Sequence, residues 1–143
     1  MAALKEREQI IRILLADDHN IFRQGLKEVI DNASDIKVTA EAGTGRGAIR
    51  EALSDDCDVV LLDLTLPDIA GKTFVQILRK EDILPLNRVL ILTCIHNVNN
   101  ATAYLQYGCA AYLGKPWDND AIIEHAMRIC ARKGMHDNLE AIF

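Results

Sequence analysis

The chain carries an aspartate at the end of one of its most apolar stretches. Asp63 follows an aliphatic run at residues 59–62, and a Pro-Asp pair comes shortly afterwards. A carboxylate is costly to bury and is uncommon in strands. If residues 59–62 form a buried strand, Asp63 leaves the core at the carboxyl end of that strand, where a cation could stabilise its charge.

Further polar residues follow other apolar runs in the same way. In chain order these are Asp17 and Asp18 after residues 10–16, Thr93 after residues 89–92, and Lys115 after residues 110–113. Because ligands of a parallel sheet bind at the carboxyl ends of its strands, we expect these side chains to share a pocket with Asp63. Neighbouring carboxylates repel one another unless a cation is present, and oxygen donors suit Mg²⁺ held partly by water.

This combination of groups is suited to phosphoryl transfer. A carboxylate beside a bound divalent cation can act as the nucleophile towards a phosphoryl donor. The cation, the ammonium group of Lys115 and the hydroxyl group of Thr93 would then neutralise the phosphoryl oxygens. The sequence therefore predicts a cation site at which one carboxylate accepts a phosphoryl group.

The elements that must position these residues alternate along the chain. Short apolar runs predict strands, and longer segments with apolar residues on one face predict helices. The expected strands are residues 10–16, 36–40, 59–62, 89–92 and 110–113, and the expected helices are residues 21–30, 45–53, 72–79, 99–107 and 118–132, the last with Asp118 as its N-cap. Strands that are apolar without strict alternation suit a parallel sheet covered on both faces, so we expect an α/β fold with a doubly wound five-stranded sheet and five helices.

Composition limits the classes of function. The chain has 143 residues, 50% of them hydrophobic, and a net charge of -5, which indicates one domain and argues against nucleic-acid binding by this chain alone. The sequence shows neither the apolar core of a signal peptide nor a membrane-spanning run. The four cysteines have no CxxC spacing, which favours reduced thiols in a cytosolic protein over a zinc site. Residues 134–143 are expected to be a tail or linker stub.

Four motifs carry a resemblance to a known family: LLADDHNIFRQGL, VVLLDLTLPDIAGKTF, VLILT and AAYLGKP. In their order and spacing they closely resemble the receiver domain of bacterial two-component response regulators. The segment DDHNIFRQGL is most similar to receivers that precede a LuxR-type (NarL/FixJ-like) helix-turn-helix. The resemblance implies a flavodoxin-like sheet of order 2-1-3-4-5, a receiver domain at residues 10–133 and a cytoplasmic location. The output domain is expected to be absent from this chain.

The resemblance implies a role for each acidic residue of the pocket. Asp63 would accept a phosphoryl group from a histidine kinase and contribute to the metal site. Asp18 would bind Mg²⁺ directly, and Asp17 would bind it directly or through water. The backbone carbonyl of Thr65 would be a further ligand.

The resemblance also implies how phosphorylation is read. Thr93 would hydrogen-bond the phosphoryl group, and Lys115 would pair with it. Tyr112 would be the aromatic switch that moves inward when Thr93 moves, and Lys115–Pro116 would be a cis peptide. The altered surface would control an output, expected to be transcription through a helix-turn-helix domain outside this chain. The chain would promote only its own phosphorylation and dephosphorylation, and would not otherwise be an enzyme.

Two positions depart from the family pattern. Cys94 follows Thr93 where the family usually has Ala, Gly or Ser, and its thiol could narrow access to the phosphoryl group. Ala70 replaces a common aspartate before Gly71. We expect both departures to affect rates and to leave the chemistry intact.

Some motifs admit a second interpretation. GTGRGA, at residues 43–48, lies between a strand and a helix, but it lacks the lysine of a P-loop and the spacing of a dinucleotide fingerprint. His19 could be a metal ligand, although a surface histidine at a helix start is the preferred interpretation. Cys94 could be a redox thiol, although an unreactive small residue is preferred.

Two other classes of function are kept as alternatives. Phosphatases of the haloacid dehalogenase type also use an aspartyl nucleophile with Mg²⁺, but they carry DxDxT on the first strand, where this chain has DDHN. A receiver-like module could instead bind partners without phosphorylation, but such a module has no need of the complete acidic set.

The last helix offers two apolar sides, of which one must face the sheet and the other could form a homodimer. One side carries Ile122, Ala126 and Ile129, and the other carries Ile123, Met127 and Cys130.

Overall fold

The computed structural model describes residues 10–54, 56–115 and 120–131. Within them, five parallel strands form one sheet of order β2-β1-β3-β4-β5. The strands are β1 (Ile11–Ala16), β2 (Ile36–Ala42), β3 (Val59–Leu62), β4 (Val89–Thr93) and β5 (Ala111–Gly114). The helices are α2 (Asn20–Asn32), α3 (Gly45–Ser54), α4 (Gly71–Lys80), α5 (Val98–Tyr107) and α6 (Asp120–Ala131). The doubly wound α/β fold and its strand order are confirmed.

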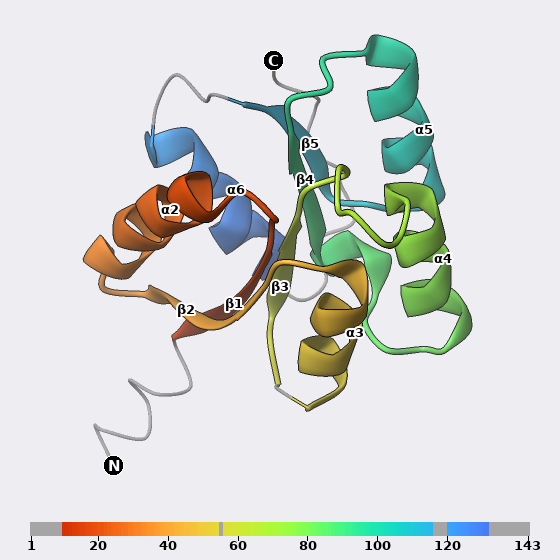
Figure 1. Ribbon diagram of the computed structural model, residues 1–143. Coiled ribbons are helices and arrows are strands. Elements are labelled where there is room, and N and C mark those ends of the chain that lie inside the picture. The colour runs from red at the N-terminus through yellow and green to blue at the C-terminus, as the bar shows by residue number, and fades with distance from the viewer. Residues whose placement is uncertain (1–9, 55, 116–119, 132–143) are drawn as a thin grey trace.

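The helices cover both faces of the sheet (Figure 1), with α2 and α6 on one face and α3, α4 and α5 on the other. Each face has its own apolar core. One core joins Phe74, Val75 and Leu78 of α4 to strand residues such as Val60, and the other joins α2 and α6 to the opposite side of the same strands. Strands β3, β4 and β5 are buried along their whole length and are apolar without alternation, whereas the edge strand β2 alternates and is partly exposed.

The face of α6 that packs on the sheet carries Ile123, Met127 and Cys130, which are buried. Ala126, which the sequence placed on the other side, is buried with them at the i+3 spacing of one helical stripe. The side chains of Ile122 and Ile129 lie outside the described residues, as do Asp118, the predicted N-cap, and the tail at residues 134–143.

Element boundaries differ from the prediction by one or two residues. β2 continues to Ala42 because that residue pairs with Ala16 at the end of β1, a partner that local sequence does not reveal. A short 3₁₀ helix, η1 (Leu86–Arg88), follows Pro85 and was not predicted.

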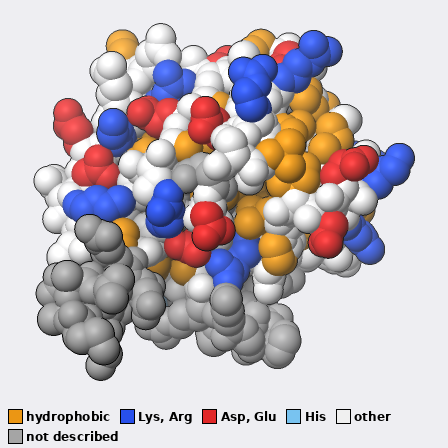
Figure 2. Space-filling model, turned by 90° about the horizontal axis from the view of Figure 1, so that it is seen from below, with side chains coloured by type: hydrophobic (Ala, Val, Ile, Leu, Met, Phe, Trp, Pro, Cys, Tyr) orange, Lys and Arg blue, Asp and Glu red, His pale blue; other side chains and the backbone are white. Residues whose placement is uncertain are grey.

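The end of the sheet opposite to the functional residues has a mixed surface (Figure 2). Acidic and basic side chains are interspersed there around one hydrophobic area. The described residues therefore form no basic patch on this face of the kind that binds nucleic acid.

Candidate functional site

The polar residues of the site extend the hydrogen-bond ladder of the sheet by one residue. The amide-to-carbonyl bonds that do so are Asp17 to Ala42 (3.0 Å), Asp63 to Ala16 (2.9 Å) and Lys115 to Thr93 (2.8 Å). Because each backbone is still paired with the neighbouring strand, the side chains are held at one edge of the sheet. The structure thus brings Asp17, Asp63 and Lys115 together at this edge, and Thr93 ends the strand that pairs with Lys115.

Lys115 is buried between two carboxylates. Its Nζ lies 2.6 Å from Oδ2 of Asp17 and 3.0 Å from Oδ2 of Asp63, and each of the three side chains is at most 7% exposed. The ammonium group also lies over the ring of Phe22, 4.0 Å from its centroid. Water screens charges weakly in such a buried setting, so the attraction within these pairs is stronger than at the surface, and it offsets the cost of removing the charges from water.

The second oxygen of Asp63 is held by the loop that follows β3. Oδ1 accepts hydrogen bonds from the amide of Thr65 at 3.2 Å and from its hydroxyl group at 3.1 Å. Burial by itself would raise the pKa of Asp63, but the hydrogen bond and charge of Lys115, aided by Thr65, outweigh burial and lower the pKa below its usual value. Asp63 is therefore ionised and able to act as a nucleophile.

Asp18 and His19 complete the cluster. The side chain of Asp18 is 32% exposed and that of His19 is 57% exposed. Nδ1 of His19 lies 3.1 Å from Oδ1 of Asp17, 3.2 Å from Oδ1 of Asp18 and 3.4 Å from Oδ2 of Asp63. The sequence interpretation of His19 as a surface histidine at a helix start describes its position but misses its contacts with the carboxylates.

The donor set fits a hard divalent cation. One ligand atom from each of Asp17, Asp18, His19 and Asp63 lies within 4.8 Å of the others. Carboxylate oxygens dominate the set, and they are the donors preferred by Mg²⁺.

A chain of hydrogen bonds leads from this edge to a buried tyrosine. The hydroxyl oxygen of Thr93 accepts from the amide of Ile95 at 3.3 Å, and the carbonyl oxygen of Ile95 accepts from the hydroxyl group of Tyr112 at 2.6 Å. The Tyr112 oxygen in turn accepts from Nδ2 of Asn100 at 3.0 Å. Thr93 and Tyr112 are fully buried, so the ring of Tyr112 occupies an inward position.

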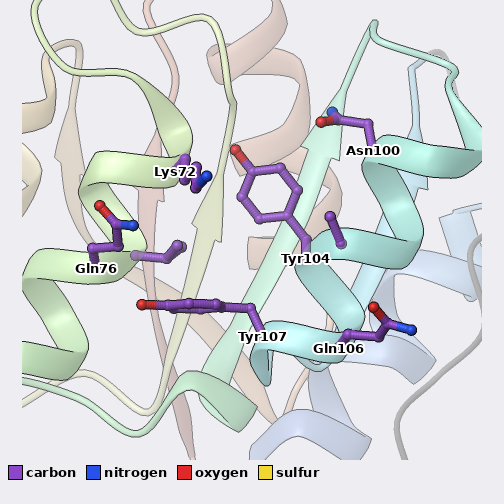
Figure 3. A pocket seen from close by; sticks show the side chains of 8 residues that line it. Lys72, Gln76, Asn100, Tyr104, Gln106 and Tyr107 are labelled. Atoms are coloured by element: carbon purple, nitrogen blue, oxygen red, sulfur yellow. The ribbon is translucent and has the colours of Figure 1, made fainter.

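Asn100, which the sequence analysis did not single out, also lines a groove between α4 and α5 with a volume of about 650 Å³. Figure 3 shows Tyr104 projecting from α5 towards Lys72 of α4. Gly71 at the start of α4 leaves space for two side chains, since a Cβ there would approach both the side chain of Leu64 and, at 2.8 Å, the hydroxyl oxygen of Tyr104. Because Asn100 lines this groove and also donates a hydrogen bond to the Tyr112 oxygen, it connects the groove to Tyr112.

A smaller hollow of about 400 Å³ opens beside the site. It is lined by His19, Ile21, Phe22, Cys94 and Lys115. Cys94 is exposed and lies in this wall together with Lys115. The effect of its thiol on rates stays a prediction.

The amides at the start of α3 already have an anionic partner. Oδ1 of Asp68 accepts from Gly45 at 2.7 Å, and Oδ2 accepts from Arg46 at 3.0 Å. A phosphate bound by GTGRGA would have to replace this carboxylate, so the structure gives no support to a nucleotide site there.

Two predicted features, the cis peptide before Pro116 and the Thr65 carbonyl ligand, stay predictions. Pro116, and with it the predicted cis peptide after Lys115, lies outside the described residues. The carbonyl group of Thr65 stays a prediction as a metal ligand.

Comparison with known proteins gives a consistent result. The family model of the response regulator receiver domain matches residues 13–127. The chain is 31% identical over 119 residues to a nitrate/nitrite response regulator homolog of Haemophilus influenzae, covering 83% of this chain and 56% of that protein. It is 30% identical over 131 residues to the transcriptional regulatory protein DegU of Brevibacillus brevis, covering 90% and 53%. The chain thus spans about half the length of the curated relatives it matches.

A solved structure matches over almost its full length. The signal receiver domain of NarL from Mycobacterium tuberculosis superposes with a TM-score of 0.79 at 26% identity, covering 89% of this chain and 99% of that one. Among the described residues, no helix is long and apolar enough to cross a membrane. From the family match, the curated relatives and the shared fold, we conclude that the chain belongs to the receiver-domain family of two-component response regulators.

Proposed function

We propose that Asp63 is the phosphoacceptor of this receiver and that a divalent cation, Mg²⁺, binds beside it. The observation that carries the proposal is the position of Asp63 between the ammonium group of Lys115 and the acidic pair Asp17–Asp18. Asp17, Asp18 and Asp63 would hold the cation through carboxylate oxygens, with the carbonyl oxygen of Thr65 as a further ligand. When bound, the cation supplies positive charge that offsets the charge of the phosphoryl oxygens.

The donor would be a phosphohistidine of a histidine kinase. A carboxylate oxygen of Asp63 forms a new bond to phosphorus while the phosphorus–nitrogen bond of the donor breaks, and the electron pair leaves with the imidazole. Lys115 then turns from the carboxylate of Asp63 to a phosphoryl oxygen. Its bond to Asp17 keeps the ammonium group in the site throughout this exchange.

Phosphorylation of Asp63 would affect Tyr112 through the hydrogen bonds of Ile95. The hydroxyl group of Thr93 donates to a phosphoryl oxygen, and this shifts the backbone of Ile95, to which Tyr112 is bonded. The 94–107 region would then change its surface. Because Asn100 of α5 also donates a hydrogen bond to the Tyr112 oxygen, α5 and Tyr112 are already connected before phosphorylation.

We propose that the altered surface controls transcription through a helix-turn-helix domain outside this chain. The name of the related DegU, a transcriptional regulatory protein, supports this proposal. DNA would be contacted only by that output domain. A homodimer through α6 is a further proposal, resting on the apolar residues of that helix that the sequence places away from the buried stripe.

We further propose a cytoplasmic location for the protein. Its four cysteines are free thiols, which suits the reducing cytoplasm. We also propose that the chain turns over no separate substrate. The loop carrying Asp63 follows β3 and not β1, which argues against the haloacid dehalogenase arrangement.

The test is the intact mass of the protein after incubation with acetyl phosphate, with Mg²⁺ or with EDTA. We expect one phosphoryl group on wild type only when Mg²⁺ is present, and none on Asp63→Asn. The control Asp56→Asn changes an exposed aspartate in another loop and should be phosphorylated like wild type. Labelling of Asp63→Asn, or labelling in EDTA, would contradict the assignment. If wild type ignores acetyl phosphate, the same variants are tested with phosphorylated kinase, and a second failure rejects the proposal.

A further inference from the structure

His19 stands at the N-cap position of α2 but does not cap the helix. Its side chain makes no capping hydrogen bond, and its backbone φ and ψ of -87° and 98° are those of an extended residue. The backbone amide instead donates to Oδ1 of Asp17 at 2.8 Å, which fixes the turn between β1 and α2. The imidazole is thereby directed towards the acidic cluster, even though more than half of the side chain is exposed.

The positions of the donor atoms match neighbouring corners of one coordination shell. Nδ1 of His19 lies 3.1 Å from an oxygen of Asp17, 3.2 Å from one of Asp18 and 3.4 Å from one of Asp63. In an octahedral site with metal–ligand bonds of about 2.1 Å, adjacent ligand atoms are about 3.0 Å apart. Nδ1 is therefore spaced from each carboxylate oxygen as a fellow ligand would be, and in the metal-free structure the 3.1 Å contact with Asp17 is a hydrogen bond.

The two oxygens of Asp17 have different partners, which leaves room for this arrangement. Oδ2 pairs with Lys115 at 2.6 Å, whereas Oδ1 faces His19. At Asp17 the lysine therefore occupies the side of the carboxylate away from the imidazole. At Asp63, by contrast, one oxygen, Oδ2, faces both Lys115 at 3.0 Å and Nδ1 of His19 at 3.4 Å, so a bound cation would share that oxygen with the lysine.

A nitrogen donor changes which cation the site prefers. Mg²⁺ is a hard ion that takes oxygen ligands and gives up water reluctantly, whereas imidazole nitrogen suits first-row transition metals. We propose that His19 is a nitrogen ligand of this cation site and gives it a preference for ions such as Mn²⁺ and Co²⁺ over Mg²⁺. This inference rests on the proposed function, because it requires that the acidic cluster holds a divalent cation.

The direct test is pulsed electron paramagnetic resonance of bound Mn²⁺. Wild type should show the modulation of a directly coordinated ¹⁴N nucleus, and His19→Ala should lose it. The control His125→Ala removes an exposed imidazole of α6 and should keep the signal. Circular dichroism establishes that each variant is folded, which we expect because His19 is largely exposed.

Calorimetric titration gives the second readout. Replacing a coordinated nitrogen by water should weaken Mn²⁺ binding to His19→Ala by about tenfold, and Mg²⁺ binding much less, so the ratio of the two affinities falls by nearly that factor. Bound Mn²⁺ without nitrogen coupling, or an unchanged ratio, would overturn the role of His19 while the metal site of the proposed function stands. If wild type binds no divalent cation at all, both proposals fail.

Discussion

Lys115 lies closer to Asp17 than to the proposed phosphoacceptor, with Nζ 2.6 Å from Oδ2 of Asp17 and 3.0 Å from Oδ2 of Asp63. The lysine thus bridges Asp17, a proposed metal ligand, and Asp63. Loss of the ammonium group would leave two buried carboxylates without their cation.

We predict that Lys115→Met lowers the free energy of unfolding at neutral pH by about 3–5 kcal/mol in the absence of metal, the usual cost of removing one partner of a buried pair. Added Mg²⁺ should restore part of the loss, because the cation takes over neutralisation of the carboxylates. Urea unfolding with EDTA or with Mg²⁺ measures both effects. Lys80→Met, at an exposed position of α4, is the matched control and should change little. Equal stability of the two variants would show that the buried pair contributes nothing.

The lowered pKa of Asp63 predicts how stability depends on pH. The folded pKa lies below that of the unfolded chain, about 4, so the unfolded state binds more protons in the window below that value. The contribution of Asp63 is fully present above about pH 4 and is lost as the pH falls through the folded pKa. Metal-free unfolding of wild type and Asp63→Asn between about pH 2.5 and 6 tests this. The stability of wild type relative to the variant should be constant above about pH 5 and decrease below about pH 4. A relative stability that increases on acidification would mean that burial outweighs Lys115.

Asn100 is predicted to hold Tyr112 in its inward position. Asn100→Ala removes the amide donor to the Tyr112 oxygen, which should cost about 1 kcal/mol and allow the ring to move outward. Fluorine NMR of protein labelled with 3-fluorotyrosine reports the environment of the ring. The Tyr112 signal should shift towards that of a solvated tyrosine in Asn100→Ala and stay unchanged in Asn99→Ala, the exposed neighbour on α5. An unchanged signal in both variants would show that the bond to Ile95 suffices.

Asp68 is predicted to stabilise the start of α3. Its carboxylate accepts from the amides of Arg46 and Gly45, and these bonds lower its pKa. Asp68→Ala should lower Tm by a few degrees at neutral pH, the effect expected of a lost helix cap in a domain of this size. Because the pKa is lowered, the difference from wild type should shrink as the pH falls below about 4. The exposed Asp56→Ala is the control for loss of one negative charge. A difference in Tm that persists at low pH would point to a cause other than the charge on Asp68.

The sequence by itself determined the strands and the residues at their ends. Uninterrupted apolar runs required a sheet buried on both faces, and the residue after such a run must emerge at its edge. Asp63 and Lys115 were therefore found from local pattern and from motif spacing together. Both signals depend only on short segments of the sequence, so they can be recognised without knowing which contacts the fold makes.

Only the tertiary structure decided the contacts between segments that are distant along the chain. The bond from Asn100 to Tyr112 and the capping of α3 by Asp68 depend on which loops and helices meet at one end of the sheet. The same is true of the contact between Nδ1 of His19 and Asp63, which follow different strands, whereas the contacts of this nitrogen with Asp17 and Asp18 are local. A residue's own neighbours in sequence set its helix or strand, but the direction of its side chain is chosen by packing and hydrogen bonding with partners that the fold brings to it.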